Sequence, residues 1–497
     1  MSRVGRAARV GVLVVVAAGI AVGAARVPGT VELAPAKGQA GLPQVSNVLV
    51  GEAALVCPGQ QRLGATGLRN VSGDVRVAAS PASAPTLRAA GVTPPSGAGQ
   101  VDLESGASGA TGPVLATGAT IDGLVGAAAA GPVVGPVIAR ATGALAPGLV
   151  ATQVWRRTGD DDRGLVVTPC GLPAADAWLL GGGAGASRTE RLVVSNPGAN
   201  AVTVAFDVFG RSGPVATAEG RSVSVPPRDR VVVSLDALAP DEAAPAVHVI
   251  ATGGVVSAVL SDQWIEGATP RGIDDSVPAA PPATTQVVAG LDVASTTSLR
   301  LVNPGTTGEA LVRVTVLTQQ GPSQPAELRA VRVPPGATID VPLALAPGAY
   351  GLRVSSDRPV AAAAWTERRA AAADRMGDFA WLPATPPVRD VAGAVLPSLD
   401  GATKRLLLSA GAQGGQVEVQ IATGTERRTQ PVAVKPDSTA VVDLGRADRV
   451  WVATRGGDVR AAVSVVAADA GVPQVAAVPL VSAPVTAVSV PVRQVGS

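Results

Sequence analysis

The sequence predicts an all-β protein: tandem immunoglobulin-like antiparallel β-sandwich modules that follow one N-terminal transmembrane or signal helix. Three observations lead to this prediction. A cassette of roughly 100 residues, the usual size of such a module, recurs along the chain. Within the cassette, apolar and polar residues alternate with a period of two, as in strands with one buried face. The chain also contains 59 Gly and 42 Pro, which favour many turns over long helices.

Two landmark motifs recur in register. Asn196-Pro197-Gly198 returns as Asn303-Pro304-Gly305, 107 positions later (303 minus 196). Val225-Pro226-Pro227 returns as Val333-Pro334-Pro335, 108 positions later (333 minus 225). Self-similarity at a nearly constant period indicates an array of like modules. Propeller blades repeat at about 40–50 residues, so a propeller fits this spacing less well.

The N-terminus resembles an export signal. An apolar run from Val10 to Ala25 follows three arginines and is closed by Arg26, which matches the charged and apolar regions of such signals. The run is slightly shorter than the about 20 residues of a spanning helix. Residues 1–26 are therefore either a cleaved signal peptide or a retained signal-anchor, and we favour the anchor. The positive-inside rule then places everything after Arg26 outside the cytoplasm.

The rest of the chain divides into a linker and four modules. The linker spans residues 27–50, the first module is a degenerate copy of the cassette, and the module boundaries are 51–176, 177–285, 286–390 and 391–497. In the first module, residues 80–148 are rich in Ala, Gly, Ser and Pro, and we expect loops and irregular strands there. We expect residues 274–285 to form a flexible junction loop.

Strands are expected in the same order in each later cassette. In the second cassette they fall at 191–195, 202–208, 223–225, 231–235, 247–250 and 255–260. In the third they fall at 299–302, 312–316, 331–333, 339–343, 352–354 and 360–365. In the fourth they fall at 406–408, 417–421, 432–434, 441–442, 450–452 and 461–466, with a closing strand in 475–490.

The two cysteines and the charge balance bear on location and partners. Cys57 and Cys170 are expected to form a disulfide, because the export signal leads to a compartment where disulfides persist. The alternative is two free buried thiols. The formal net charge is only +2, with acidic and basic residues interspersed, so the chain lacks the basic stripe that nucleic-acid binding requires.

Few residues are available for catalysis. His248 is the one histidine, which excludes sites that need two histidine ligands from this chain. No G-x-S-x-G motif offers a nucleophile elbow. The glycine-rich segment 181–186 superficially resembles a dinucleotide fingerprint, but a strand follows it where that motif requires a helix. We therefore expect no enzyme, no metal and no cofactor.

Two acidic clusters are the remaining route to catalysis. Asp160-Asp161-Asp162 and Asp274-Asp275 fall in expected loops, each beside an Arg-Gly step. Paired carboxylates serve glycoside hydrolysis, and clustered ones bind calcium. Charged loop clusters are more often simply solvated, and that is the interpretation we favour.

Tryptophan and arginine recur together after the sixth strand of three cassettes. The pairs are Trp155 with Arg163, Trp264 with Arg271, and Trp365 with Arg375. One interpretation is that each Trp closes the end of a sandwich and the Arg stacks over it as a cation–π partner. The other is a row of rings and guanidinium groups that binds a cell-envelope glycan or an envelope protein. These six residues are the candidate ligand-binding set.

The N-terminal export segment, the recurring Asn-Pro-Gly, Val-Pro-Pro and Trp landmarks, and the lack of a catalytic motif resemble a family of uncharacterised actinobacterial secreted or membrane-anchored proteins with a domain of unknown function. The resemblance covers almost the whole chain and implies a cell-envelope location. It implies no activity and transfers no functional residue.

The function expected from the sequence is a non-enzymatic, extracytoplasmic scaffold of tandem β-sandwich repeats, held to the membrane through the N-terminal helix. Two alternatives stay open at this point. One is an envelope glycoside hydrolase that uses the loop carboxylates. The other is an accessory subunit of a cell-wall glycosyltransferase.

Overall fold

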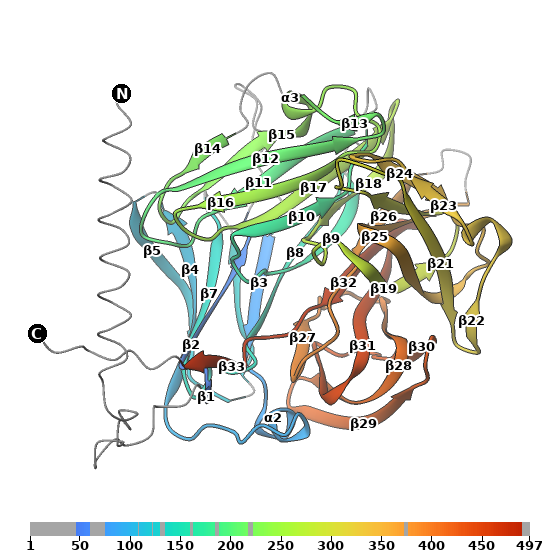
Figure 1. Ribbon diagram of the computed structural model, residues 1–497. Coiled ribbons are helices and arrows are strands. Elements are labelled where there is room, and N and C mark those ends of the chain that lie inside the picture. The colour runs from blue at the N-terminus through green and yellow to red at the C-terminus, as the bar shows by residue number, and fades with distance from the viewer. Residues whose placement is uncertain are drawn as a thin grey trace, which may run out of the picture. The chain divides into compact units, whose positions relative to one another are not determined.

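Antiparallel strands account for nearly all of the regular structure, which confirms the predicted all-β class (Figure 1). The structure is a computed structural model that describes residues 46–59, 75–107, 109–121, 123–129, 135–159, 163–183, 188–216, 222–371 and 376–489. Within these ranges, helix is limited to α2 (Ala84–Ala89), α3 (Leu235–Leu238) and the 3-10 helix η1 (Ala326–Leu328). None of these described helices is long and apolar enough to span a membrane. The expected N-terminal helix, residues 1–26, lies outside the described residues.

The chain divides into two compact units, Met1–Val48 with Val488–Ser497, and Leu49–Ala487. The strands β1 (Ser46–Leu49) and β33 (Thr486–Ser489) form a two-stranded sheet. Everything described below belongs to the second unit, Leu49–Ala487.

The first module is a sandwich of two four-stranded sheets. One sheet has the order β2 (Glu52–Cys57), β7 (Val137–Gly143), β4 (Gly99–Ala107) and β5 (Ala110–Gly118). The other has the order β6 (Val125–Ala129), β3 (Val75–Ser80), β8 (Val150–Thr158) and β9 (Arg163–Pro169). Their facing sides enclose one core that includes Leu55, Val77, Leu103 and Trp155. The expectation of loops and irregular strands over residues 80–148 is confirmed only for the β4–β5 pairing, which contains register shifts. The rest of this Ala- and Gly-rich segment forms further strands and α2, which the sequence did not predict.

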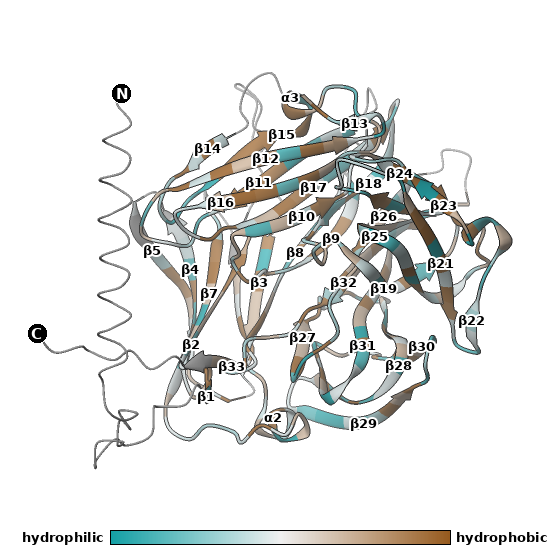
Figure 2. Ribbon diagram, viewed as in Figure 1, coloured by the Kyte–Doolittle hydropathy of each residue, from teal (hydrophilic) through white to brown (hydrophobic). Residues whose placement is uncertain are grey.

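The second module repeats this two-layer design. One sheet contains β10 (Asp176–Leu180), β16 (Ala246–Thr252), β12 (Val202–Gly210) and β13 (Gly213–Pro214), with β14 (Ser222–Val225) also on β12. The other contains β15 (Arg230–Ser234), β11 (Arg188–Ser195), β17 (Ser257–Glu266) and β18 (Thr269–Ser276). On β12, Val204 and Phe206 are buried while Thr203 and Asp207 are exposed, which is the predicted alternation. Figure 2 shows the apolar character of β11 and β12.

In the third module one long strand joins the two layers. The first half of β25 (Gly348–Arg369) pairs with β19 (Ala283–Val293) and β21 (Ala310–Thr318). Its second half pairs with β20 (Thr297–Val302) and β26 (Gly377–Pro383). The smaller strands of the module are β22 (Gly321–Ser323), β23 (Val331–Val333) and β24 (Thr338–Pro342).

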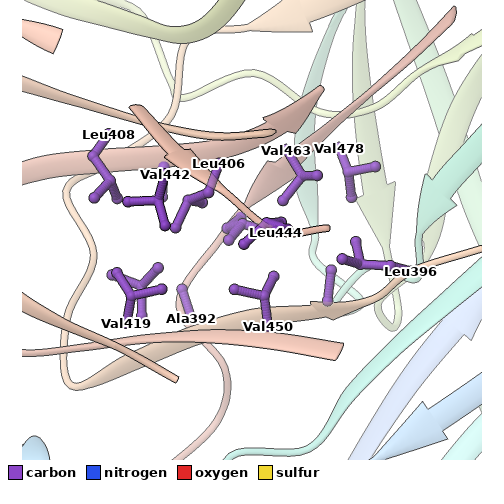
Figure 3. Close-up of a cluster of buried hydrophobic side chains, with 14 of the residues drawn as sticks. Ala392, Leu396, Leu406, Leu408, Val419, Val442, Leu444, Val450, Val463 and Val478 are labelled. Atoms are coloured by element: carbon purple, nitrogen blue, oxygen red, sulfur yellow. The ribbon is translucent and has the colours of Figure 1, made fainter. Parts of the chain in front are cut away.

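The fourth module uses two such long strands, β28 (Thr403–Thr423) and β31 (Arg449–Asp469). Its other strands are β27 (Val391–Val395), β29 (Glu426–Val434), β30 (Thr439–Asp443) and β32 (Val472–Leu480). Figure 3 shows Leu406 and Val463 facing Val419 and Val450 across the core. Both long strands therefore contribute one half to each layer, and a single hydrogen-bonded sheet folds into a sandwich.

The last strand of each module packs against the last strands of two other modules. β9 contacts β18, β18 contacts β26, β26 contacts β32, and β32 contacts β9 (Figure 1). These four strands, which we call the central strands, form a closed cycle. The modules are thus arranged around a shared centre, and the first module meets the fourth directly.

Candidate functional site

The three recurring tryptophans lie close to the central strands. Trp155 is only 3% exposed and belongs to the core of the first module. Trp264 and Trp365 are half-buried, with ring centroids 6.2 Å apart and planes tilted by 52°. Phe379 packs against both, at 6.5 Å and 6.2 Å. Trp155 therefore offers no ring face to a sugar, and Trp264 and Trp365 mainly pack against each other and Phe379.

The arginines that follow these tryptophans differ in what they contact. The Arg271 guanidinium lies 5.8 Å from the centre of the Trp264 ring, in a cation–π arrangement. Arg163 instead forms a salt bridge with Asp469 of the fourth module, and it is Arg157 that lies over Trp155, at 4.9 Å. Arg375 lies outside the described residues. Arg163 thus links the first module to the fourth, whereas the contact of Arg271 with Trp264 lies within the second module.

The acidic pair Asp274-Asp275 lies inside β18, so the expectation of a junction loop beginning there is wrong. Asp274 is 2% exposed and accepts a hydrogen bond from the Trp381 backbone N–H at 2.7 Å. Asp275 is also buried and accepts one from the Thr168 hydroxyl at 2.7 Å. Burial raises the pKa of Asp274 well above its usual range. Both carboxylates are tolerated inside β18 because the first and third modules supply hydrogen-bond donors to them. The other cluster, Asp160–Asp162, lies outside the described residues.

Asp378, which the sequence reasoning missed, occupies the meeting point of the central strands. Its carboxylate accepts backbone N–H bonds from Leu165 at 2.9 Å, Ile273 at 3.2 Å, Phe379 at 3.1 Å and Val475 at 2.9 Å. Each of the four modules therefore supplies one donor. Asp378 is fully buried, and burial raises its pKa while the four N–H groups oppose that rise.

Glycine makes room for this carboxylate. Gly164 and Gly272 occupy, in β9 and β18, the position that Asp378 holds in β26. A Cβ atom on Gly272 would lie 2.3 Å from Asp378 Oδ1 and 2.7 Å from its Cα, and the Gly272 φ is +126°. The recurrent Arg-Gly step in the sequence was the one available signal for this centre.

A buried polar network lies between the second and third modules. The Trp381 indole N–H donates to Asp262 Oδ2 at 2.9 Å, and Arg188 binds the same carboxylate through two N–H groups at 2.7 Å and 2.6 Å. Glu190 lies beside them and is 4% exposed. Burial raises the pKa of Glu190 to about 8, the Asp262 charge adds to the rise, and Arg188 opposes it.

His248 lies in β16 near the surface of the second module. Its Nε2 is 2.6 Å from Asp176 Oδ2, and its ring stacks on Trp178 at 4.3 Å. This environment is that of a hydrogen-bonded surface residue. In the described part of the chain, no group of three or more His, Cys, Asp or Glu side chains is placed to hold a metal ion.

A groove of about 490 Å³ lies where the first module meets the fourth. Its floor is the outer face of β3 and β8, with Arg76, Ala78, Val154 and Arg156, and its wall is the segment 395–399, which begins at the last residue of β27. We call it the seam groove. Its volume falls within the roughly 300–1,000 Å³ of ligand pockets, which are common at domain interfaces.

Two of the other junctions are filled by comparison. Trp178, Phe209, Phe379 and Trp381 pack together between the second and third modules. Between the third and fourth, a Cβ on Gly290 would lie 2.4 Å from the Ala462 methyl group, so the backbones approach closely there. The seam groove is therefore the candidate functional site.

Comparison with known proteins gave one family. The model of a family of unknown function, DUF5719, matches residues 124–445. No curated protein matches the chain. Among solved structures, Escherichia coli alpha-2-macroglobulin activated by porcine elastase is similar at 11% sequence identity, with a TM-score of 0.12 over 87% of this chain and 44% of that chain. The chain thus spans less than half of that protein, and the likeness supports no conclusion about fold or function.

Proposed function

The chain belongs to the DUF5719 family, for which no function is known, and we propose that it is a non-enzymatic scaffold of the extracytoplasmic cell envelope. In this proposal the modules hold or recognise an envelope component, and residues 1–26 anchor the chain to the membrane. An envelope protein is the favoured partner over a glycan, because Trp155, Trp264 and Trp365 are not presented as an open row of rings.

The disulfide supports the location. Cys57 at the end of β2 is bonded to Cys170 just after β9, which links the two sheets of the first module. Both cysteines are buried. Disulfides persist in oxidising compartments and are rare in the cytosol, so the bond is compatible with an extracytoplasmic protein.

The single observation that carries the non-enzymatic role is the use of the buried carboxylates. A catalytic acid or base must come within hydrogen-bond reach of a substrate. Asp274 and Asp378 instead accept hydrogen bonds from the backbone of other modules and are closed to solvent. A glycosidase needs two carboxyl groups about 5–10 Å apart with a sugar between them, and the buried pair Asp274-Asp275 leaves no room for one.

The location is tested by producing the full chain with its own N-terminal segment in a bacterial host and fractionating the cells. We expect the protein in the envelope fraction, released by detergent, with Cys57 and Cys170 of the denatured chain resistant to alkylation until a reductant is added. Recovery of the chain in the cytosol with both thiols alkylated would exclude the proposed location.

The absence of turnover is tested on the same preparation with cell-wall polysaccharide as substrate. We expect no release of reducing sugar above a buffer blank. Release that disappears when Asp160, Asp161 and Asp162 are replaced by Asn would instead establish the hydrolase alternative. Cross-linking in intact cells then identifies the envelope protein that the scaffold contacts.

A further inference from the structure

The seam groove has an aliphatic interior. Ala78 and Val154 form its floor, and Leu124, Leu396 and Leu399 line its sides. None of the described residues that line it is aromatic. A sugar or a nucleobase would find no ring to stack on, so the lining favours a flexible hydrocarbon chain.

The backbone N–H and C=O groups of the two floor strands are engaged in hydrogen bonds with strands on both sides. β3 lies between β6 and β8, and β8 lies between β3 and β9, so both are interior strands of their sheet. A peptide that binds by strand addition needs an exposed sheet edge. The seam groove offers none, which argues against an extended peptide as the occupant.

Arg76 places a positive charge in the seam groove. Arg76 and Val154 are directly opposite each other in the β3–β8 register, so the Arg76 side chain rises from the same face as the apolar floor. Arg76 is exposed, and no acidic side chain of the described chain lies within salt-bridge distance of it. Arg156, by contrast, is held by Gln474 at 2.7 Å and by Asp469 at 3.7 Å.

Among the described residues that line the groove, Asp448 is the one carboxylate, and it is satisfied within its own module. Asp448 accepts hydrogen bonds from Arg449 at 2.9 Å and from the Gly424 backbone N–H at 2.6 Å. Arg76 is therefore the groove group best placed to attract a charged ligand, and that ligand is an anion.

We infer that the seam groove binds an amphiphile with an aliphatic chain and an anionic head. The chain lies along Ala78, Val154 and the segment 395–399, and the carboxylate or phosphate of the head pairs with Arg76. This inference rests on the proposed binding role and gives it a ligand class. A free fatty acid and a phospholipid share this chemistry.

The test is isothermal titration calorimetry on protein purified from expression of the full chain. The probes are laurate and dodecyl phosphate below their micelle-forming concentrations, with dodecyltrimethylammonium as the cationic counterpart. We expect one molecule of laurate or dodecyl phosphate per chain and no saturable binding of the cation. Tighter binding of laurate indicates a fatty acid as the source, and tighter binding of dodecyl phosphate indicates a phospholipid.

Three variants assign the site. Arg76→Gln is expected to weaken binding of both anions about threefold to tenfold, since it removes one charge-assisted contact near the surface. Ala78→Leu fills the floor and is expected to abolish binding. Arg313→Gln, at an exposed mid-strand arginine of the third module, is the matched control and should bind like the parent protein.

The inference fails if neither anion binds, if the cation binds as tightly as the anions, or if Ala78→Leu binds like the parent. Thermal unfolding of each variant confirms that it is folded. The fractionation and alkylation results do not depend on these titrations, so a failure here leaves the proposed location standing.

Discussion

The side-chain amide of Asn303 donates a hydrogen bond to the carbonyl oxygen of Val333, 3.1 Å away. Asn196 makes the same bond to Val225, also at 3.1 Å, and each asparagine accepts the N–H of the glycine two residues later. The Asn-Pro-Gly and Val-Pro-Pro motifs of each cassette are therefore hydrogen-bonded to each other. The side chain that shapes the Asn-Pro-Gly turn also satisfies the carbonyl just before Pro-Pro.

The first prediction concerns this contact. Asn196→Ala removes donors to the carbonyls of Val225, Pro226 and Asn200 and leaves buried carbonyl oxygen without a partner. We expect a loss of about 1–3 kcal/mol in the free energy of unfolding, measured by urea denaturation. Asn200→Ala, at an exposed neighbour, is the control; equal stability of the two variants would contradict the assigned role.

The second prediction concerns the shared carboxylate. Asp378→Ala leaves four buried N–H groups from four modules without an acceptor, and each such group costs about 1–3 kcal/mol. We expect the cooperative thermal transition to fall sharply in temperature and to broaden as the modules uncouple, measured by calorimetry. Asp400→Ala, at an exposed turn, should leave the transition unchanged. An unaltered transition in Asp378→Ala would refute a coupling role.

The third prediction separates close packing from backbone strain. Gly272→Ala places a methyl group against Asp378 at a positive φ. Gly213→Ala introduces the same methyl group at a similar φ of +119° with no atom within 4 Å. We expect Gly272→Ala to be the less stable variant by about 1–3 kcal/mol, the usual cost of overpacking, in parallel urea titrations. Equal losses would mean that the central strands adjust freely.

The fourth prediction concerns pH. The pKa of Glu190 is raised to about 8 by burial, above its unfolded value of 4.5, so the unfolded chain ionises this group first as the pH rises. The contribution of Glu190 to stability is therefore fully present below pH 4.5 and is lost as the pH rises through about 8. We expect the Tm of the parent protein to fall over this range and the Tm of Glu190→Gln to fall less. Parallel profiles would show that other groups set the pH dependence.

Strands such as β12 could be predicted because one of their faces is exposed. Val204 and Thr203 alternate in burial, and that alternation is written in the sequence. β18 could not be predicted in the same way, since both of its faces are covered by protein and Asp274 and Asp275 follow each other inside it. Burial between modules removes the period of two on which the prediction depended.

Asp378 and the seam groove could not be predicted from the sequence, for a different reason. Asp378 has no counterpart in the repeat, because Gly164, Gly272 and Gln474 stand at the matching positions, so no recurrence marked it. The seam groove combines Arg76 with Leu396, which are far apart in the chain. Only the contact between the first and fourth modules brings them together, and no local pattern encodes that contact.

The sharing of one carboxylate among four central strands limits how such a chain can change in length. In a chain with three modules, Asp378 would lack one hydrogen-bond donor and the ring of central strands would be incomplete. In a chain with five modules, the central strand of the fifth could not reach the Asp378 carboxylate. We therefore expect duplication or deletion of a whole repeat to be excluded, while turns and hairpins at the periphery lengthen or shorten freely. The number of modules is therefore fixed at four, unlike that of a linear repeat array, which can gain or lose repeats.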